Sequence, residues 1–282
     1  MANIKQLDII TILLLAIILT VLRKLLSENI FKKFSQFMAL NPRDSQTFVE
    51  CMWRLLYYSL SFSLLFTHVF IEMSGHFFDN NTNLFEDYMN QSSTGSIHSL
   101  TSIEWSIYML ELGYYMHALY ALLILDENLK DFNAMLTHHL MAITIMTVAY
   151  AIQIGTIGSV ILMFHDGTDI LMETSKCLNC FRRLSGTWGQ VTGLLTVVMF
   201  LLFFISWIVF RLYLFPITIL NEVTKSGPHP AIFLLFLLHW LLLSLNIYWF
   251  IFIVKILLNI TDIKDSRQQT DSNKKQRKVT KM

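Results

Sequence analysis

Two apolar runs between Asp131 and Lys176 carry ionisable side chains that membrane-spanning helices normally exclude. The ionisable residues of the two runs are His138, His139, His165, Asp166, Asp169, Glu173 and Lys176. A charge at bilayer depth costs about 2.5–3.5 kcal/mol on insertion scales, so such side chains face the protein interior and usually have a function there. A chain with this pattern is therefore restricted to a bundle of membrane helices whose polar residues meet inside it.

The five ionisable residues of the second run share one face of a helix. At about 100° per residue, they all fall within about 100° of His165. In two antiparallel helices, His138 lies seven residues from the charged end at Asp131. Asp169 lies seven residues from Lys176, at the same end. Both positions are then about 10 Å inside one membrane face, so the spacing predicts that the histidine pair and Asp169 can meet.

The same residues resemble the longevity-assurance motif of ceramide synthases (sphingosine N-acyltransferases), which are members of the TLC-domain family. A histidine pair followed by HDxTDxxxExxK aligns without a gap onto His138, His139, Tyr150, Gly158, His165, Asp166, Asp169, Glu173 and Lys176. The chain departs from the family pattern at Ala149, Gln153, Thr156, Thr168, Met172 and Cys180. Thr156 stands where the family has an arginine, which bears on the substrate rather than on the fold.

Weaker similarity extends outward, to IEWSIYMLELGYYMHAL and KDF before the histidine pair and FRLYLFP after it. The resemblance implies a TLC-like catalytic membrane domain over residues 48–260. An N-terminal transmembrane helix and cytosolic connector (1–47) precede it, and a basic cytosolic tail (261–282) follows. It also implies an enzyme of the endoplasmic reticulum membrane that N-acylates a sphingoid base with acyl-CoA, forming ceramide or dihydroceramide. Homo- or hetero-dimerisation stays open, and no cofactor, metal or nucleic acid is expected.

The resemblance and the polar residues of the chain together give a set of candidate site residues. The candidate catalytic residues are His138, His139, His165, Asp166 and Asp169. The candidate substrate-binding residues are Tyr150, Glu111, Tyr115, Glu173 and Lys176. Glu111 and Tyr115 belong to a polar stripe of i, i+4, i+7, i+11 spacing that starts at Glu104 and predicts one buried face of a helix. Packing is the alternative role for that stripe, and an i, i+3 ion pair is the alternative for Glu173 and Lys176.

The composition indicates a polytopic membrane protein. Hydrophobic residues make up 54% of the 282 residues, charged residues make up 15%, and the mean hydropathy is +0.52. These values exclude a soluble domain. Cys51, Cys177 and Cys180 are too few for a disulfide framework or a four-cysteine zinc site. We interpret them as packing residues or palmitoylation sites rather than as redox groups.

We expect an all-α fold with about seven transmembrane helices that enclose a lipid-binding cavity. The predicted spans are residues 8–26, 49–71, 101–125, 132–154, 157–178, 191–215 and 231–258. Arg23 and Lys24 follow the apolar run directly, an order opposite to that of a cleaved signal peptide, so we expect a retained helix. Residues 27–47 fit an interfacial helix or an amphipathic connector. The tail from Asp262 has the composition of a disordered segment.

Two independent signals fix the predicted orientation. Lys and Arg gather in the first connector, around Lys176 and in the tail, which all fall on one side and are therefore placed in the cytosol. The loop 72–100 lacks Lys and Arg and carries glycosylation sequons at Asn80 and Asn90, which places it in the lumen. The N-terminus is then luminal, the C-terminus is cytosolic, and the candidate site lies in the cytosolic half.

The chemistry of N-acylation requires a base, because an ammonium is not a nucleophile. Histidine can act as that base, or it can attack the thioester and carry the acyl group itself. An aspartate bonded to a ring nitrogen would orient the histidine. The residues leave open which histidine has which role.

Two other classes of function compete with acyl transfer. Metal catalysis is disfavoured because the nine histidines are scattered, apart from one adjacent pair. The main alternative is a non-enzymatic TLC-domain protein for lipid binding, transport or translocation, which would need the cavity but not the paired histidines and aspartates. We interpret Arg211, His239 and Asn246, each alone on its helix, as structural or headgroup contacts.

Overall fold

The computed structural model describes residues 4–72, 102–125, 131–152, 155–184, 186–225 and 230–279. Every regular element in these ranges is a helix, which confirms the predicted all-α fold class. The chain forms two compact units, Met1–Leu243 and Ser244–Met282, which are described separately. The sequons at Asn80 and Asn90 lie outside the described residues, as does Gln153.

The helices follow one another along the chain, and several contain π-helical turns, here labelled η. Their bounds are α1 (Gln6–Leu26), η1 (Ser27–Phe31), α2 (Lys32–Phe37), α3 (Pro42–Phe66), η2 (Thr67–Glu72), α6 (Ser102–Tyr120), η3 (Ala121–Leu125), α7 (Phe132–Ala151), α8 (Gly155–Phe181), α9 (Thr187–Ser206), η4 (Trp207–Leu214), α10 (Phe215–Lys225) and α11 (Pro230–Val279).

Five of the described helical segments are long and apolar enough to cross a membrane, so the chain is a multi-pass membrane protein. They are Gln6–Phe37, Ser102–Leu125, Phe132–Ala151, Thr187–Leu220 and Pro230–Leu258. The helices α3 and α8, which were also predicted as spans, are not among these five. The total of seven spans stays a prediction.

The connector between the first two predicted spans differs from the expectation. Instead of a separate helix over residues 27–47, the first helix continues through η1 into α2 and stops at Phe37. The chain turns there, and α3 begins at Pro42 rather than near Val49. The Asn41 side chain accepts a hydrogen bond from the Asp44 backbone N–H at 2.9 Å, and proline at the first helical position suits this cap.

The prediction that the C-terminal tail is disordered is wrong for its secondary structure. The helix α11 continues to Val279, over 50 residues. No proline or glycine follows Pro230, and the Lys, Arg and Gln residues of the tail are good helix formers, so nothing in the sequence ends the helix. A solvated composition therefore did not exclude a regular helix here.

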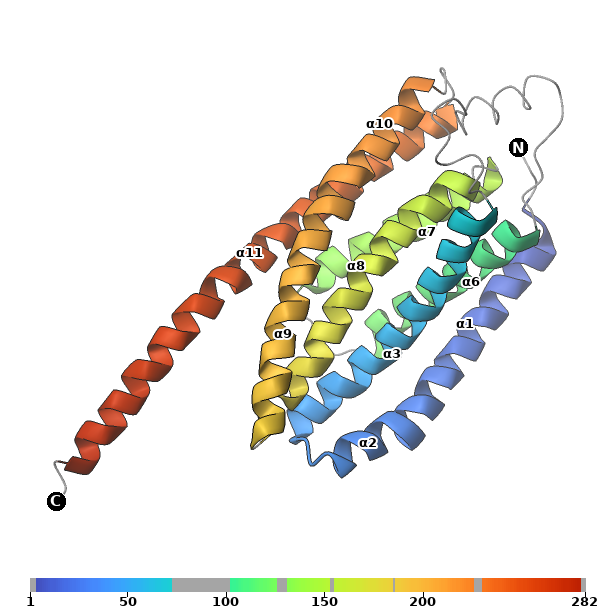
Figure 1. Ribbon diagram of the computed structural model, residues 1–282. Helices are drawn as coiled ribbons and strands as arrows, with labels where there is room; N and C mark the ends of the chain where they lie inside the picture. Colours follow the sequence, from blue (N-terminus) through green and yellow to red (C-terminus); the bar gives the residue numbers. More distant parts are fainter. Residues whose placement is uncertain are drawn as a thin grey trace. The chain divides into compact units, whose positions relative to one another are not determined.

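The helix α8 lies in the middle of the first unit (Figure 1). It packs along α3 on one side and α9 on the other, and it also contacts α6, α7 and η4. The helix α1 packs along α6, where the backbones approach closely at Gly113. A Cβ atom at Gly113 would lie 2.7 Å from the Cβ atom of Leu15, so this approach requires glycine.

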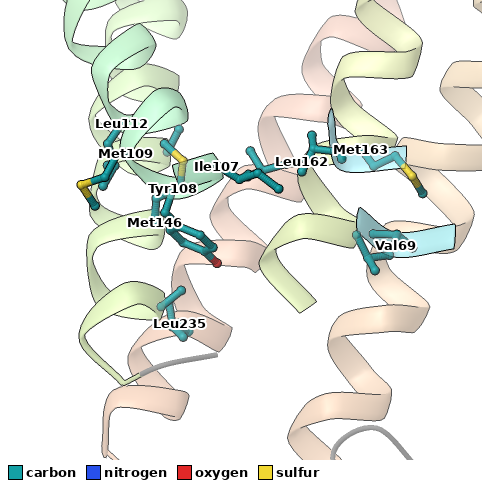
Figure 2. Packing of buried hydrophobic residues seen from close by; sticks show 13 residues of the cluster. Val69, Ile107, Tyr108, Met109, Leu112, Met146, Leu162, Met163 and Leu235 are labelled. Carbon is teal, nitrogen blue, oxygen red and sulfur yellow. The ribbon is translucent and has the colours of Figure 1, made fainter. Parts of the chain in front are cut away.

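The main hydrophobic core is formed by α6, α7 and α8 together with η2 and the start of α11 (Figure 2). Its buried members include Val69, Tyr108, Met146, Met163 and Leu235. A second buried cluster contains Cys51, Cys177 and Cys180, which are all free thiols. The core fixes α7 against α6 and α8, so that polar residues at its edge face one another.

Candidate functional site

The ionisable face of α8 is turned into the helix bundle, as its spacing predicted. His165, Asp166 and Glu173 are buried, Asp169 is half-buried and Lys176 is exposed. Lys176 is at the end of α8 that the sequence places at the membrane face. Burial of these charges requires partners from neighbouring helices, because an isolated buried charge costs several kcal/mol.

Arg211 on η4 is the partner of Asp169. Its Nη2 donates to Asp169 Oδ1 at 2.6 Å and to the backbone carbonyl of His165 at 3.1 Å. The guanidinium also lies 4.4 Å from the centre of the Trp207 ring, a cation–π contact. Arg211 is only 3% exposed, so the pair is buried on its cationic side and half-buried at Asp169. The sequence indicated a structural or headgroup contact for Arg211 but did not predict its pairing with Asp169.

The histidine pair of α7 faces Tyr115 of α6. The ring centres of His138 and His139 are 5.6 Å apart, and that of Tyr115 lies 6.2 Å and 5.8 Å from them. His138 also lines the same pocket as His165 of α8, whose backbone carbonyl accepts from Arg211. The structure therefore brings His138 of α7 to the same pocket as the α8 face.

A buried serine joins the two carboxyl groups of the site. The Ser61 hydroxyl on α3 is hydrogen-bonded to both Glu111 on α6 and Asp166 on α8. All three side chains are buried. Ser61 had no distinguishing signal in the sequence, because several serines occupy this part of α3.

Glu173 is held at the outer edge of the site by two cations. Lys176 Nζ lies 2.9 Å from Glu173 Oε1, which confirms the expected i, i+3 pair. Arg54 Nε on α3 lies 3.2 Å from the same oxygen, and the sequence did not predict this contact. Glu173 therefore joins α8 to α3 through Arg54, and its two cationic partners cover the end of the site.

Tyr150 lies away from these groups. Its hydroxyl donates to Asp8 Oδ2 on α1 at 2.8 Å, and Trp105 Nε1 donates to Asp8 Oδ1 at 3.1 Å. Asp8 also accepts from the backbone N–H of Lys5 at 3.0 Å. Tyr150 therefore joins α7 to α1, and the structure does not place it with the other predicted substrate-binding residues.

A pocket of about 50 Å³ borders the polar site. Tyr115, His138 and His165 line its polar part, and His239 also contributes. Its apolar walls are Ala142, Ile145, Met146, Ala149, Ile161, Leu162 and Leu242. Drug-sized ligands occupy about 300–1,000 Å³, so the pocket must widen to hold a lipid chain. The predicted lipid-binding cavity stays a prediction, although an apolar pocket does lie beside the histidines.

Metal ligation was the main rival chemistry in the sequence. Among the residues that the structure describes, no three His, Cys, Asp or Glu side chains are grouped as metal ligands. The arrangement that is present offers neutral or cationic histidines, a buried carboxyl pair and a buried arginine. These groups suit proton transfer and nucleophilic attack on a carbonyl carbon.

Comparisons with known proteins point in one direction. The family profile described as TLC domain (TRAM/LAG1/CLN8) matches residues 47–255. Ceramide synthase 1 of Homo sapiens is 29% identical over 259 residues, which cover 88% of this chain and 72% of that protein. Ceramide synthase 4 of Homo sapiens is 29% identical over 248 residues, covering 82% and 57%. Ceramide synthase LOH2 of Arabidopsis thaliana is 29% identical over 175 residues, covering 62% and 53%.

Proposed function

This chain belongs to the TLC-domain family, and from that premise we propose that it is a ceramide synthase, which transfers an acyl group from acyl-CoA to the amine of a sphingoid base. The observation that supports the proposal is the pocket that His138, next to His139 on α7, shares with His165 of the buried α8 face. A lipid carrier would need an apolar pocket but would gain nothing from these buried charges, which cost several kcal/mol each. The relatives named ceramide synthases support the same reaction.

The reaction requires the amine to lose two protons. The amine nitrogen attacks the thioester carbon, the C–N bond forms and the C–S bond breaks. The departing thiolate takes one proton and becomes the free thiol, and the second proton leaves the site. In the proposed mechanism, one histidine of the pair removes a proton from the ammonium, or attacks the thioester and carries the acyl group until the amine arrives.

Asp169 has a different hydrogen-bond partner from the one that the sequence predicted. The expectation was that Asp169 orients a histidine ring, as in a catalytic triad. In the structure, Asp169 accepts a hydrogen bond from Arg211, which also binds the carbonyl of His165. We assign to the Asp169–Arg211 pair the task of holding η4 against α8, so that the pocket wall and the histidines keep their spacing.

The proposal includes a membrane orientation and a compartment. The cytosolic half of the bundle would hold the site, because the basic residues gather at that end and acyl-CoA is a cytosolic thioester. The endoplasmic reticulum follows from the family resemblance alone. Protease access to the tail in sealed microsomes tests the orientation, and protection of the tail inside the vesicles would contradict it.

The experiment for the reaction uses the purified full chain in lipid nanodiscs. It is incubated with acyl-CoAs of several lengths and a sphingoid base, and the products are analysed by mass spectrometry. We expect N-acylated product whose formation survives exhaustive chelation. Binding of both lipids without amide formation would favour a carrier, and loss of activity on chelation would favour a metalloenzyme.

A further inference from the structure

The buried trio of Ser61, Glu111 and Asp166 has too few hydrogen-bond donors if both carboxyl groups are ionised. The Ser61 Oγ atom is hydrogen-bonded to Glu111 Oε1 and to Asp166 Oδ2. A serine hydroxyl has one proton to donate, whereas an ionised carboxylate can only accept. One of the two contacts therefore requires a carboxyl proton that is donated to Ser61 Oγ.

The depth of the trio leads to the same conclusion. Ser61 and Glu111 are each 1% exposed and Asp166 is 3% exposed. Two ionised carboxylates this deep, joined through one oxygen, would each lack hydration and would repel each other. A single shared proton removes one charge and supplies the missing donor. The trio then holds one proton beyond that of the serine hydroxyl.

One further ion pair lies beside the trio, and its cation is Arg211. Asp169 follows Asp166 by three residues on α8, and Arg211 of η4 donates to Asp169. Arg211 is already paired with Asp169 at 2.6 Å. The surroundings therefore balance one negative charge on the trio better than two.

Tyr115 connects this trio to the histidine pair. Its ring centre lies 5.8 Å from that of His139 and 6.2 Å from that of His138. The same tyrosine follows Glu111 by four residues on α6, so the two side chains lie on the same face of that helix. Tyr115 therefore lies between the histidine pair and the helix turn that carries Glu111.

We propose that Glu111 and Asp166, bridged by Ser61, form a proton store that receives the second proton released when the sphingoid amine is acylated. The inference rests on the proposed function. The amine nitrogen loses two protons as the C–N bond forms, one goes to the thiolate that leaves as the C–S bond breaks, and the other passes from a histidine to the trio. The trio changes from one stored proton to two, and it returns to one when that proton is released to water.

In this scheme Ser61 is a positioning residue. It does not touch the substrate, but it holds the two carboxyl oxygens close enough to share a proton. Neither its role nor that of the bridge follows from the histidine motif, which contains only Asp166 of the three residues. The trio joins α3, α6 and α8 at one point, so a purely structural role must be separated from proton storage by experiment.

The first test is independent of any substrate. Infrared difference spectra of the full chain in nanodiscs at neutral pH compare the wild type with Glu111→Gln and with Asp166→Asn. We expect the carbonyl stretch of a protonated carboxyl group, sensitive to D2O, to be lost in both variants, because the new amide N–H replaces the acid proton. The proposal would be overturned if the wild-type protein lacked that band and the difference spectra showed no loss of it.

The second test uses the rate of amide formation. Glu111→Gln should lower turnover by about 10²-fold, the usual contribution of a positioned acid or base, and imidazole added to the buffer should restore part of the rate. Ser61→Ala should lower turnover with little change in the KM for acyl-CoA, and Ser61→Thr should keep most of the activity. The matched control is Ser63→Ala on the same helix, since Ser63 is exposed and bonds only to its own helix at Ser59, 2.7 Å away.

The outcomes separate this proposal from the proposed function. Normal turnover of a folded Glu111→Gln variant, or a loss that external base does not rescue, would refute proton storage while leaving ceramide synthesis intact. If the wild-type chain forms no amide, the proposed function fails and the storage role fails with it. The infrared band then still decides whether the carboxyl pair holds a proton.

Discussion

The neighbouring helices α8 and α9 run side by side but differ in their ionisable side chains (Figure 1). On α8, His165, Asp166 and Glu173 are buried, and Asp166 and Glu173 have polar partners from α3. On α9, apolar side chains such as Leu194 and Ile205 are 67% and 56% exposed, as suits contact with lipid. The comparison shows that α9 presents apolar side chains outward, whereas α8 turns ionisable side chains into the bundle, beside the hydrophobic core.

The same comparison explains why α8 is not among the five helical segments that are apolar enough to be recognised as membrane spans. A helix whose buried face carries several ionisable residues has too low an apolar content to be recognised as a span. Its charges are tolerated because each has a partner within the protein. The site is therefore built around a helix whose buried face carries ionisable residues, and the predictions below run from the largest expected effect to the smallest.

The largest effect is expected on removal of the cation that pairs with Asp169. Arg211→Leu leaves the half-buried carboxylate of Asp169 without its partner and should lower the free energy of unfolding by about 3–5 kcal/mol. Thermal unfolding in nanodiscs measures it. The double variant with Asp169→Asn should recover more than half of the loss, because no charge is then left unpaired. Equal stability of the single and double variants would contradict the pairing.

A smaller effect is expected at Asp8, which holds α1 against α6 and α7. Asp8→Ala leaves the Trp105 and Tyr150 donors without an acceptor and should cost about 1–3 kcal/mol of stability. Turnover per folded molecule should change little, since Asp8 lies away from the histidines. Tyr150→Phe, which removes one donor, should cost less. A large loss of turnover in Tyr150→Phe would return Tyr150 to the substrate-binding set.

The exposed member of the outer ion pair should matter still less. Lys176→Met removes one of two cations bound to Glu173 and should cost between about 0 and 1 kcal/mol, because Lys176 is exposed and Arg54 remains. Amide formation should fall less than in either histidine variant. A loss as great as that of the histidine variants would place Lys176 in direct contact with acyl-CoA.

The smallest effect is expected on the lipid-facing helix. Leu194→Ala changes an exposed side chain of α9 and should alter stability by no more than about 0.5 kcal/mol and leave turnover unchanged. Thermal unfolding in nanodiscs measures the stability, and amide formation measures the turnover. A strong effect would show that this face of α9 is covered by protein rather than by lipid.

The sequence predicted those parts of the structure that depend on regular helical periodicity. The face of α8 was predictable because 3.6-residue periodicity relates its ionisable residues, and the burial of Glu111 followed from the stripe on α6. The pairing of Arg211 with Asp169 was missed because Arg211 stands alone on its helix and its partner is distant in sequence, on α8. Ser61 was missed because its role depends on two partners, Glu111 and Asp166, that are distant in sequence.

The measurement that tests the central claim most directly compares amide formation by the wild type, His138→Ala and His139→Ala. Each purified variant, shown to be folded by its unfolding temperature, is given acyl-CoA and a sphingoid base. If the α7 histidines work with the buried face of α8, each substitution should reduce turnover by about 10²-fold or more while leaving folding intact. Near-normal turnover in both variants would contradict the account and favour a lipid-carrier function.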